Sequence, residues 1–207
     1  MTPRFRALSS GLVAAAALAA TCQAGAQGTT AAAPGALHAR SGSSRPGRGF
    51  IDLNVGRATY HTDCGVAGLT CQDNVTSYSV TAGNMFSDDF GAELTYLNFG
   101  TARRAGGGVS ARGLNLSAVG KLPLGQYFAL EGKVGATYGI THVNALAGSG
   151  VSSGKAKGFG LGYGAALDLN IGRHLQGQVG WEQHDFHFAG QGMSKVRNVT
   201  VGLNYRF

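Results

Sequence analysis

The 207-residue sequence is poor in proline, cysteine and charge. Proline occurs 4 times and cysteine 3 times, and only 13% of the residues are charged. The 35 glycines follow no triplet repeat, which excludes a collagen helix. The longest apolar run, GLVAAAALAA, is too short to cross a bilayer as a helix, for which about 20 residues are needed. No phosphate-binding glycine loop, serine-centred elbow or nucleotide fingerprint is present.

The positive charge is spread along the chain and does not form a basic face. The formal net charge is +7, and a pI near 9.6 raises nucleic acid as a partner. Most charges occur singly between apolar residues, and no aromatic platform motif accompanies them. We therefore expect no nucleic-acid partner, and no motif in the sequence requires a cofactor.

The first 48 residues precede the patterned part of the chain. Residues 1–26 have the features of a secretory signal peptide: the basic start MTPRFR, a short apolar run and the small-residue cleavage site AGA. Residues 27–48 are small, polar and basic without periodicity, and are predicted to form a flexible periplasmic leader. Residues 49–207 form the predicted domain.

Apolar residues alternate with polar or small residues throughout this domain. The closing sequence VTVGLNYRF alternates up to the last residue, which indicates a strand whose end is paired. About 9 to 11 residues suffice for a tilted strand to cross a bilayer, and each alternating segment is long enough. Eight such segments are predicted: 50–60, 76–86, 90–99, 112–122, 127–140, 157–171, 174–187 and 196–207.

Long and short connections alternate between these segments. The odd-numbered segments are followed by the longer polar connections HTDCGVAGLTCQDN, GTARRAGGGVSA, THVNALAGSGVSSG and FAGQGMSK. The even-numbered segments are followed by the short connections SDD, PLGQ and GR. Such alternation gives loops at one end of a sheet and tight turns at the other. The predicted fold is all-β: an eight-stranded antiparallel up-and-down transmembrane β-barrel in which the last strand pairs with the first.

Alternation by itself does not tell which face of the strands points inward. A soluble lipocalin-like binding protein has its apolar face inside, whereas a membrane barrel has it outside. Aromatic residues favour the membrane barrel, because they gather near both ends of the segments as interfacial belts do. The turn-end group is Phe50, Phe86, Phe90, Tyr127, Phe128, Tyr205 and Phe207, and the loop-end group is Tyr60, Tyr96, Tyr138 and Phe159.

Three segments carry a resemblance to a known family. SVTAGNMFSDDFGAELTYLNFG, VGKLPLGQYFALEGKVGATYG and VTVGLNYRF together resemble the eight-stranded barrel of the OmpA-like outer-membrane proteins and of the related OmpX-like barrels. The resemblance covers residues 49–207. The peptidoglycan-binding domain of the full-length relatives has no counterpart here, so their wall-anchoring role is not implied.

The resemblance implies a location in the bacterial outer membrane, with the loops outside and both termini periplasmic. Barrels of this kind serve as structural proteins, narrow pores, adhesins or serum-resistance factors. Tyr205 and Phe207 resemble the C-terminal signal that the barrel insertion machinery reads. The expected partners are therefore this machinery, outer-membrane lipids and lipopolysaccharide. The cations near the loops are interpreted first as ordinary solvated charges and, in the alternative, as contacts for lipopolysaccharide phosphates: Arg57, Arg103, Arg104, Lys155 and Lys195.

The strand register directs a set of charged residues to the barrel interior. Glu93 is expected to pair with Lys121, and Asp52 with Arg206 across the closure. Two interpretations stay open: a salt-bridged plug that fixes the register, or a gate in a narrow ion pathway. Glycines on the inner face of segment 157–171 leave either room for opposing side chains or a water-filled space. The predicted charge network is Asp52, Glu93, Lys121, Glu131, Lys133, Asp168, Glu182 and Arg206.

Cysteine and histidine give two further local patterns. Cys64 and Cys71 lie close together in one loop of an exported chain, which predicts a disulfide. His184 and His187 are three residues apart, so in a regular strand they point to opposite faces and do not share a metal ion. Phe186 suggests a local break in register, because strict alternation would turn it inward, and the same holds for Phe188. No metal site is expected.

An enzymatic alternative is a barrel that modifies lipid A. Some eight-stranded barrels are lipid A deacylases with a serine, a histidine and an acid on the lipid-facing surface. Asp185 and His187 resemble part of that set, but Ala189 stands where the serine is required. We therefore predict no catalytic residues, and a non-enzymatic barrel with a structural or surface-interaction role.

Overall fold

The structure is a computed structural model that describes residues 48–69, 71–72 and 74–207. The predicted signal peptide at 1–26 lies outside the described residues, as does the predicted leader up to residue 47. No helix among the described residues is long and apolar enough to cross a membrane.

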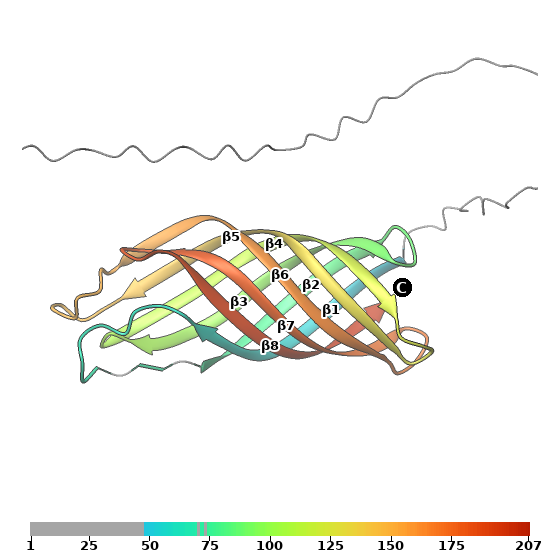
Figure 1. Cartoon of the computed structure of the whole chain (residues 1–207), viewed down its shortest axis with the longest axis horizontal. Helices are drawn as coiled ribbons and strands as arrows, with labels where there is room; N and C mark the ends of the chain where they lie inside the picture. The colour runs from blue at the N-terminus through green and yellow to red at the C-terminus, as the bar shows by residue number, and fades with distance from the viewer. Residues whose placement is uncertain (1–47, 70, 73) are drawn as a thin grey trace, which may run out of the picture. The chain divides into compact units, whose positions relative to one another are not determined.

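Eight antiparallel strands form a closed barrel in which each strand pairs with its neighbours in the sequence (Figure 1). The ring is closed by β1 and β8, whose ladder runs from Phe50 opposite Arg206 to Tyr60 opposite Val196. The predicted fold class is confirmed. The strands are β1 (Arg48–Tyr60), β2 (Asn74–Met85), β3 (Phe90–Arg104), β4 (Gly107–Pro123), β5 (Phe128–Asn144), β6 (Gly154–Asn170), β7 (Leu175–Phe188) and β8 (Gly192–Arg206).

The apolar face of the strands points outward. Leu53 is 59% exposed, whereas its neighbour Asp52 is 3% exposed. The same inversion holds around the ring, with leucine, valine and aromatic side chains outside and carboxylates, amides and hydroxyls inside. Hydrocarbon is the solvent that such an outer surface requires. The alternative of a soluble lipocalin-like barrel is therefore wrong.

Two members of the predicted aromatic belts lie inside the barrel. Phe50 and Tyr60 are each 2% exposed, because both share the inward register of Asp52 on β1. The other aromatic residues of the belts are outward, among them Phe90 near the turns and Phe159 near the loops. The odd or even position of a residue within its strand therefore predicts whether its side chain points inward better than its distance from the strand end does.

The second and fourth predicted loops are much shorter than expected. Strand β3 continues to Arg104 and pairs with Gly107, which leaves a two-residue connection, Ala105 and Gly106. Both residues have positive φ angles, of 50° and 72°, as the tightest hairpin turns require. These strand ends were not predicted because glycine-rich segments pair through their backbones without showing an apolar alternation.

Strands β6 and β7 pair only in their turn-end halves. Their ladder ends at Gly162 opposite His184, whereas β5 and β6 remain paired as far as Gly154. A methyl group added at Gly160 would lie 1.9 Å from the Asp185 carbonyl oxygen. The hydroxyl of Thr141 on β5 donates to the carbonyl of His187 on β7, with an O–O distance of 2.5 Å. Because the β6 glycines have no side chains, the backbone of β7 can pack closely against β6.

Replacing Gly160 by alanine is expected to destabilise the barrel by about 1 to 3 kcal/mol, because the added carbon overlaps the backbone of β7. Gly132→Ala is the matched control, since nothing lies within 4 Å of the position its Cβ would take. It should change the free energy of unfolding by less than about 0.5 kcal/mol. Urea unfolding in detergent micelles, followed by fluorescence of the single tryptophan, measures both. Equal stabilities of the two variants would contradict the close packing at Gly160.

Candidate functional site

The interior near the turns holds an ion cluster centred on Lys121. Its ammonium nitrogen lies 2.7 Å from Glu131 and 2.7 Å from Asp168. Gln178 donates to Asp168 at 3.0 Å and to Glu131 at 3.3 Å. The four residues come from β4, β5, β6 and β7, and all are buried. This Lys121 cluster ties four consecutive strands together inside the barrel.

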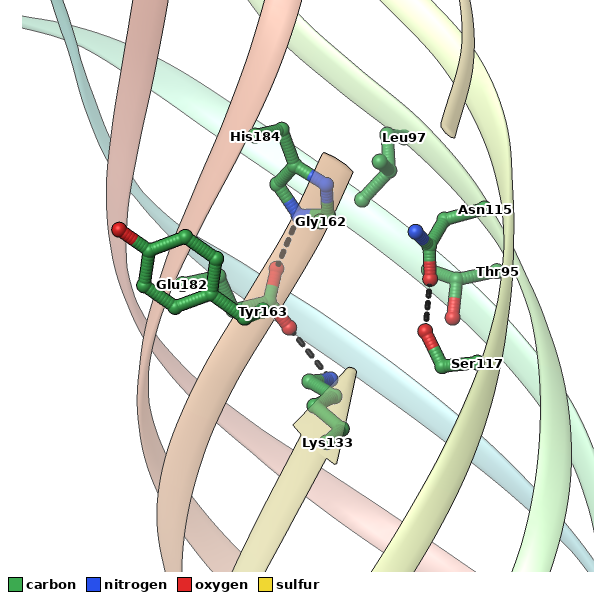
Figure 2. A pocket seen from close by; sticks show the side chains of 9 residues that line it. All are labelled: Thr95, Leu97, Asn115, Ser117, Lys133, Gly162, Tyr163, Glu182 and His184. Atoms are coloured by element: carbon green, nitrogen blue, oxygen red, sulfur yellow. Dashed lines mark hydrogen bonds and ion pairs between the residues drawn. The ribbon is translucent and has the colours of Figure 1, made fainter. Parts of the chain in front are cut away.

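A second ion cluster, centred on Lys133, lies further toward the loops (Figure 2). The ammonium nitrogen is 2.5 Å from Glu182 and 3.3 Å from Glu93. Nε2 of His184 lies 3.4 Å from Glu182, and its Nδ1 lies 2.9 Å from the hydroxyl of Thr137. The pocket around this Lys133 cluster has no room for a water-sized sphere. Side chains therefore fill the interior at this level.

The pairing inside the barrel differs from the expected one. Glu93 contacts Lys133, not Lys121, because the ladder sets Glu93 opposite Ser117, four residues away from Lys121 on β4. Asp52 is opposite Asn204, and Arg206 is opposite Phe50. Asp52 is buried, and its Oδ1 has no hydrogen-bond partner among the described residues. Arg206 is half-buried at the turn end.

An apolar cluster fills the interior between the Lys133 cluster and the loops. The rings of Phe99 and Phe186 meet edge to face at 5.6 Å, and the Phe99 ring lies 5.6 Å from the His184 ring. The apolar side chains thus begin directly at the edge of the Lys133 cluster. The cluster comprises Ala58, Tyr60, Val75, Leu97, Phe99, Ala102, Val109, Ala111, Val143, Phe186, Phe188 and Val196.

The expected register break in β7 is wrong. Pairing with β8 continues without interruption from Leu175 to Phe188, and both phenylalanines point inward. This apolar cluster was not predicted, although the sequence contains a signal for it. Phe99 and Phe186 stand in the register of the polar interior residues at the loop ends of their strands, where large apolar side chains indicate a core.

Loop residues are fastened over the apolar cluster. Arg104 is 3% exposed and donates to the carbonyl of Tyr60 at 2.7 Å and to that of Thr62. The Tyr60 hydroxyl donates to the Gly100 carbonyl at 2.8 Å. Arg104 also approaches Sγ of Cys64, which forms the predicted disulfide with Cys71. Arg104 therefore helps to cover the apolar cluster at the loop end and does not face lipid, contrary to expectation.

The loops also bond to one another. Val66 in the disulfide loop donates its amide to Ser149 at 3.1 Å, and Leu146 donates to Ala105 at 2.9 Å. The amide of Asp63 donates to the Gln191 side chain at 3.2 Å. All four loop-end connections thus take part in one hydrogen-bonded cap.

Most of the remaining predicted residues lie on the surface. Arg57, Arg103, Lys155 and Lys195 are exposed near the loops. Asp185 and His187 are instead half-buried, because they lie against Gly160 and Gly158 of β6. The described residues contain no group of three or more acidic, histidine or cysteine side chains that could hold a metal ion. Tyr205 and Phe207 point outward, and the Phe207 amide donates to Gly49 at 3.0 Å.

Comparisons with known proteins agree with this architecture. Residues 7–207 match the family described as outer membrane protein beta-barrel domain. Neisserial surface protein A superposes with a TM-score of 0.60 at 11% identity, over 77% of this chain and 97% of that one. Ail of Yersinia pestis superposes with a TM-score of 0.52 at 19% identity, over 78% and 99%. Curated proteins give no sequence match. At these identities the structural matches show the fold alone.

Lys133→Met is expected to cost about 3 to 5 kcal/mol of folding free energy, because it leaves two buried carboxylates without a cation. Adding Glu93→Gln and Glu182→Gln to the same chain should recover part of this loss. Lys195→Met, at an exposed position, is the matched control and should be nearly neutral. Guanidinium unfolding in micelles reports all three, and a Lys133→Met variant as stable as the control would rule out a structural role for the cluster.

Proposed function

The chain belongs to the outer membrane protein beta-barrel domain family, and on that premise we propose that it is a non-enzymatic outer-membrane barrel with a plugged interior, a structural role and a loop end that makes surface contacts. Its loops face the cell exterior, and both termini face the periplasm. The C-terminal residues Tyr205 and Phe207 are its signal to the barrel insertion machinery.

The apolar cluster is the observation that carries the plugged interior. An ion that travelled along the barrel axis would leave the Lys133 cluster and meet the buried rings of Phe99 and Phe186. Apolar constrictions exclude water and so block ions. The alternative of a narrow pore with an ionic gate lacks the continuous polar path that it requires.

The surroundings of Asp185 and His187 on β7 support the absence of catalysis. Nδ1 of His187 and Oδ1 of Asp185 have no hydrogen-bond partner among the described residues. Hydrolysis requires a nucleophile within reach of its base, and residue 189 is alanine. A lipid A deacylase is therefore not the function that these residues support.

Charge supports the orientation. Four exposed cations each stand one outward step toward the loops from an exposed apolar residue: Arg57 next to Val55, Arg112 next to Leu114, Lys157 next to Phe159 and Arg197 next to Val199. The turn between β2 and β3 instead carries Asp88 and Asp89. Lipopolysaccharide phosphates in the outer leaflet attract the cationic end, so the loop end faces outward with lipopolysaccharide as its neighbour.

Planar-bilayer recordings test the plugged interior. The refolded wild-type protein and the Glu131→Gln variant are both expected to show no conductance, because the apolar cluster is intact in both. A Phe99→Ala/Phe186→Ala variant, checked for folding by its heat-dependent gel mobility, is expected to conduct. Regular conductance steps in the wild type whose size changes in Glu131→Gln would contradict the plugged interior and indicate a gated pore.

Cysteine labelling in intact cells tests the orientation. Ala147→Cys, in the exposed loop between β5 and β6, is expected to react with a membrane-impermeant maleimide. Gln126→Cys, in the turn between β4 and β5, is the matched control and should react only after the outer membrane is opened. The wild-type chain supplies the background. Labelling of Gln126→Cys but not Ala147→Cys in intact cells would reverse the proposed orientation.

A further inference from the structure

A groove of about 330 Å³ lies on the outward face of β3, β4 and β5 at the loop end. It begins where the exposed apolar band ends. The ladder places Tyr96, Leu114 and Tyr138 side by side in the band, and the next outward step on β4 is Arg112. Its lining comprises Asn98, Gly100, Thr101, Gly108, Ser110, Ala111, Arg112, His142 and Asn144.

Local backbone geometry creates this groove. The β3–β4 register shifts between Asn98 and Thr101, so that the outward row is interrupted by a bulge. Gly100 adopts a φ of 69° within the bulge, which favours glycine. Across from it, Gly108 has no side chain and Ser110 has a small one. The space between Arg112 and the end of the hairpin therefore stays open.

The groove has the chemistry of an anion site. The guanidinium of Arg112 is exposed and makes no hydrogen bond or ion pair with the described residues. The imidazole of His142 likewise makes none with them. Lys155 is opposite His142 on β6, which adds positive charge beside the groove. The outward faces of β3 to β6, all within the described part of the chain, carry no aspartate or glutamate. Guanidinium groups bind phosphate oxygens in paired hydrogen bonds.

The side chain of Asn98 adds an ordered polar group to this wall. Its amide nitrogen donates to the Tyr78 hydroxyl at 2.8 Å, and its oxygen accepts from the Gly100 amide at 3.0 Å. These bonds fix the wall that faces Arg112, because Asn98 and Arg112 are opposite each other in the ladder. A ligand in the groove would thus contact the fixed side chain of Asn98 on one side and the unpaired guanidinium of Arg112 on the other.

We propose that this groove, termed the Arg112 groove, binds the phosphorylated head group of a membrane lipid. The phosphate lies at Arg112 and His142, and the acyl chains lie along Leu114, Tyr138 and Ile140 in the apolar band. The proposal rests on the proposed function, because it requires lipid around the barrel. Two sources carry the same chemistry: the phosphates of a lipid A glycolipid and those of an anionic phospholipid.

Native mass spectrometry of the refolded barrel, titrated with lipid from mixed micelles, measures the affinity. The probes are diphosphorylated lipid A, its dephosphorylated form and phosphatidylglycerol. Arg112→Gln is expected to weaken binding of the phosphorylated probe about tenfold, as befits the loss of charge-assisted hydrogen bonds. Ser110→Phe keeps every charge but fills the groove, and should weaken binding by a similar factor.

Arg173→Gln is the matched control, because it removes one exposed positive charge at the turn end, away from the groove. It should change the affinity less than about twofold. Sensitivity of lipid A binding to Arg112→Gln identifies the glycolipid as the source, and the same sensitivity with phosphatidylglycerol alone identifies the phospholipid; either result supports the groove.

The groove is overturned if Arg112→Gln and Ser110→Phe both bind lipid A and phosphatidylglycerol like the control, or if Arg112→Gln weakens the binding of dephosphorylated lipid A as much as that of a phosphorylated probe. Heat-dependent gel mobility of every variant shows whether the barrel has folded. A folded barrel in the outer membrane that shows no phosphate preference would remove the groove and leave the proposed function intact.

Discussion

The pairing of β1 with β8 is the constraint on which the rest of the structure depends. A strand edge in hydrocarbon leaves backbone donors and acceptors without partners, and no water is present to replace them. The ladder from Phe50 to Tyr60 removes that edge and explains why the alternation continues to the last residues of the chain. Closure also creates an interior too narrow to stay empty, so every inward side chain must find a neighbour.

The interior meets this demand in two different ways along the barrel. Near the turns, Lys121 and Lys133 each bridge two carboxylates, which offsets part of the buried negative charge. Near the loops, phenylalanine, valine and alanine side chains pack around Tyr60, whose hydroxyl bonds to the backbone. Buried ion pairs fix register, because a shift of one residue would separate them, whereas the apolar cluster excludes water. The proposed structural role rests on these two ways of filling the interior.

The outer surface is divided by the same register. An apolar band faces lipid, and the first residues beyond it at the loop end are cations such as Arg57 and Arg112. The bulge at Gly100 interrupts this order on one side of the barrel and opens the Arg112 groove. Contact with lipid is therefore not uniform around the ring: a local backbone irregularity sets an unpaired arginine in a concave surface directly above the acyl-chain level.

The sequence by itself determined the eight strands, their order and the charged residues that point inward near the turns, because strand alternation has a fixed period of two and the loop lengths alternate. It did not determine which inward residues meet. Contacts across a barrel depend on the stagger between strands, which set Glu93 beside Lys133 instead of Lys121. The burial of Arg104, the hairpin end at Ala105 and Gly106 and the overlap at Gly160 likewise arise from backbone geometry in three dimensions, which a one-dimensional period does not encode.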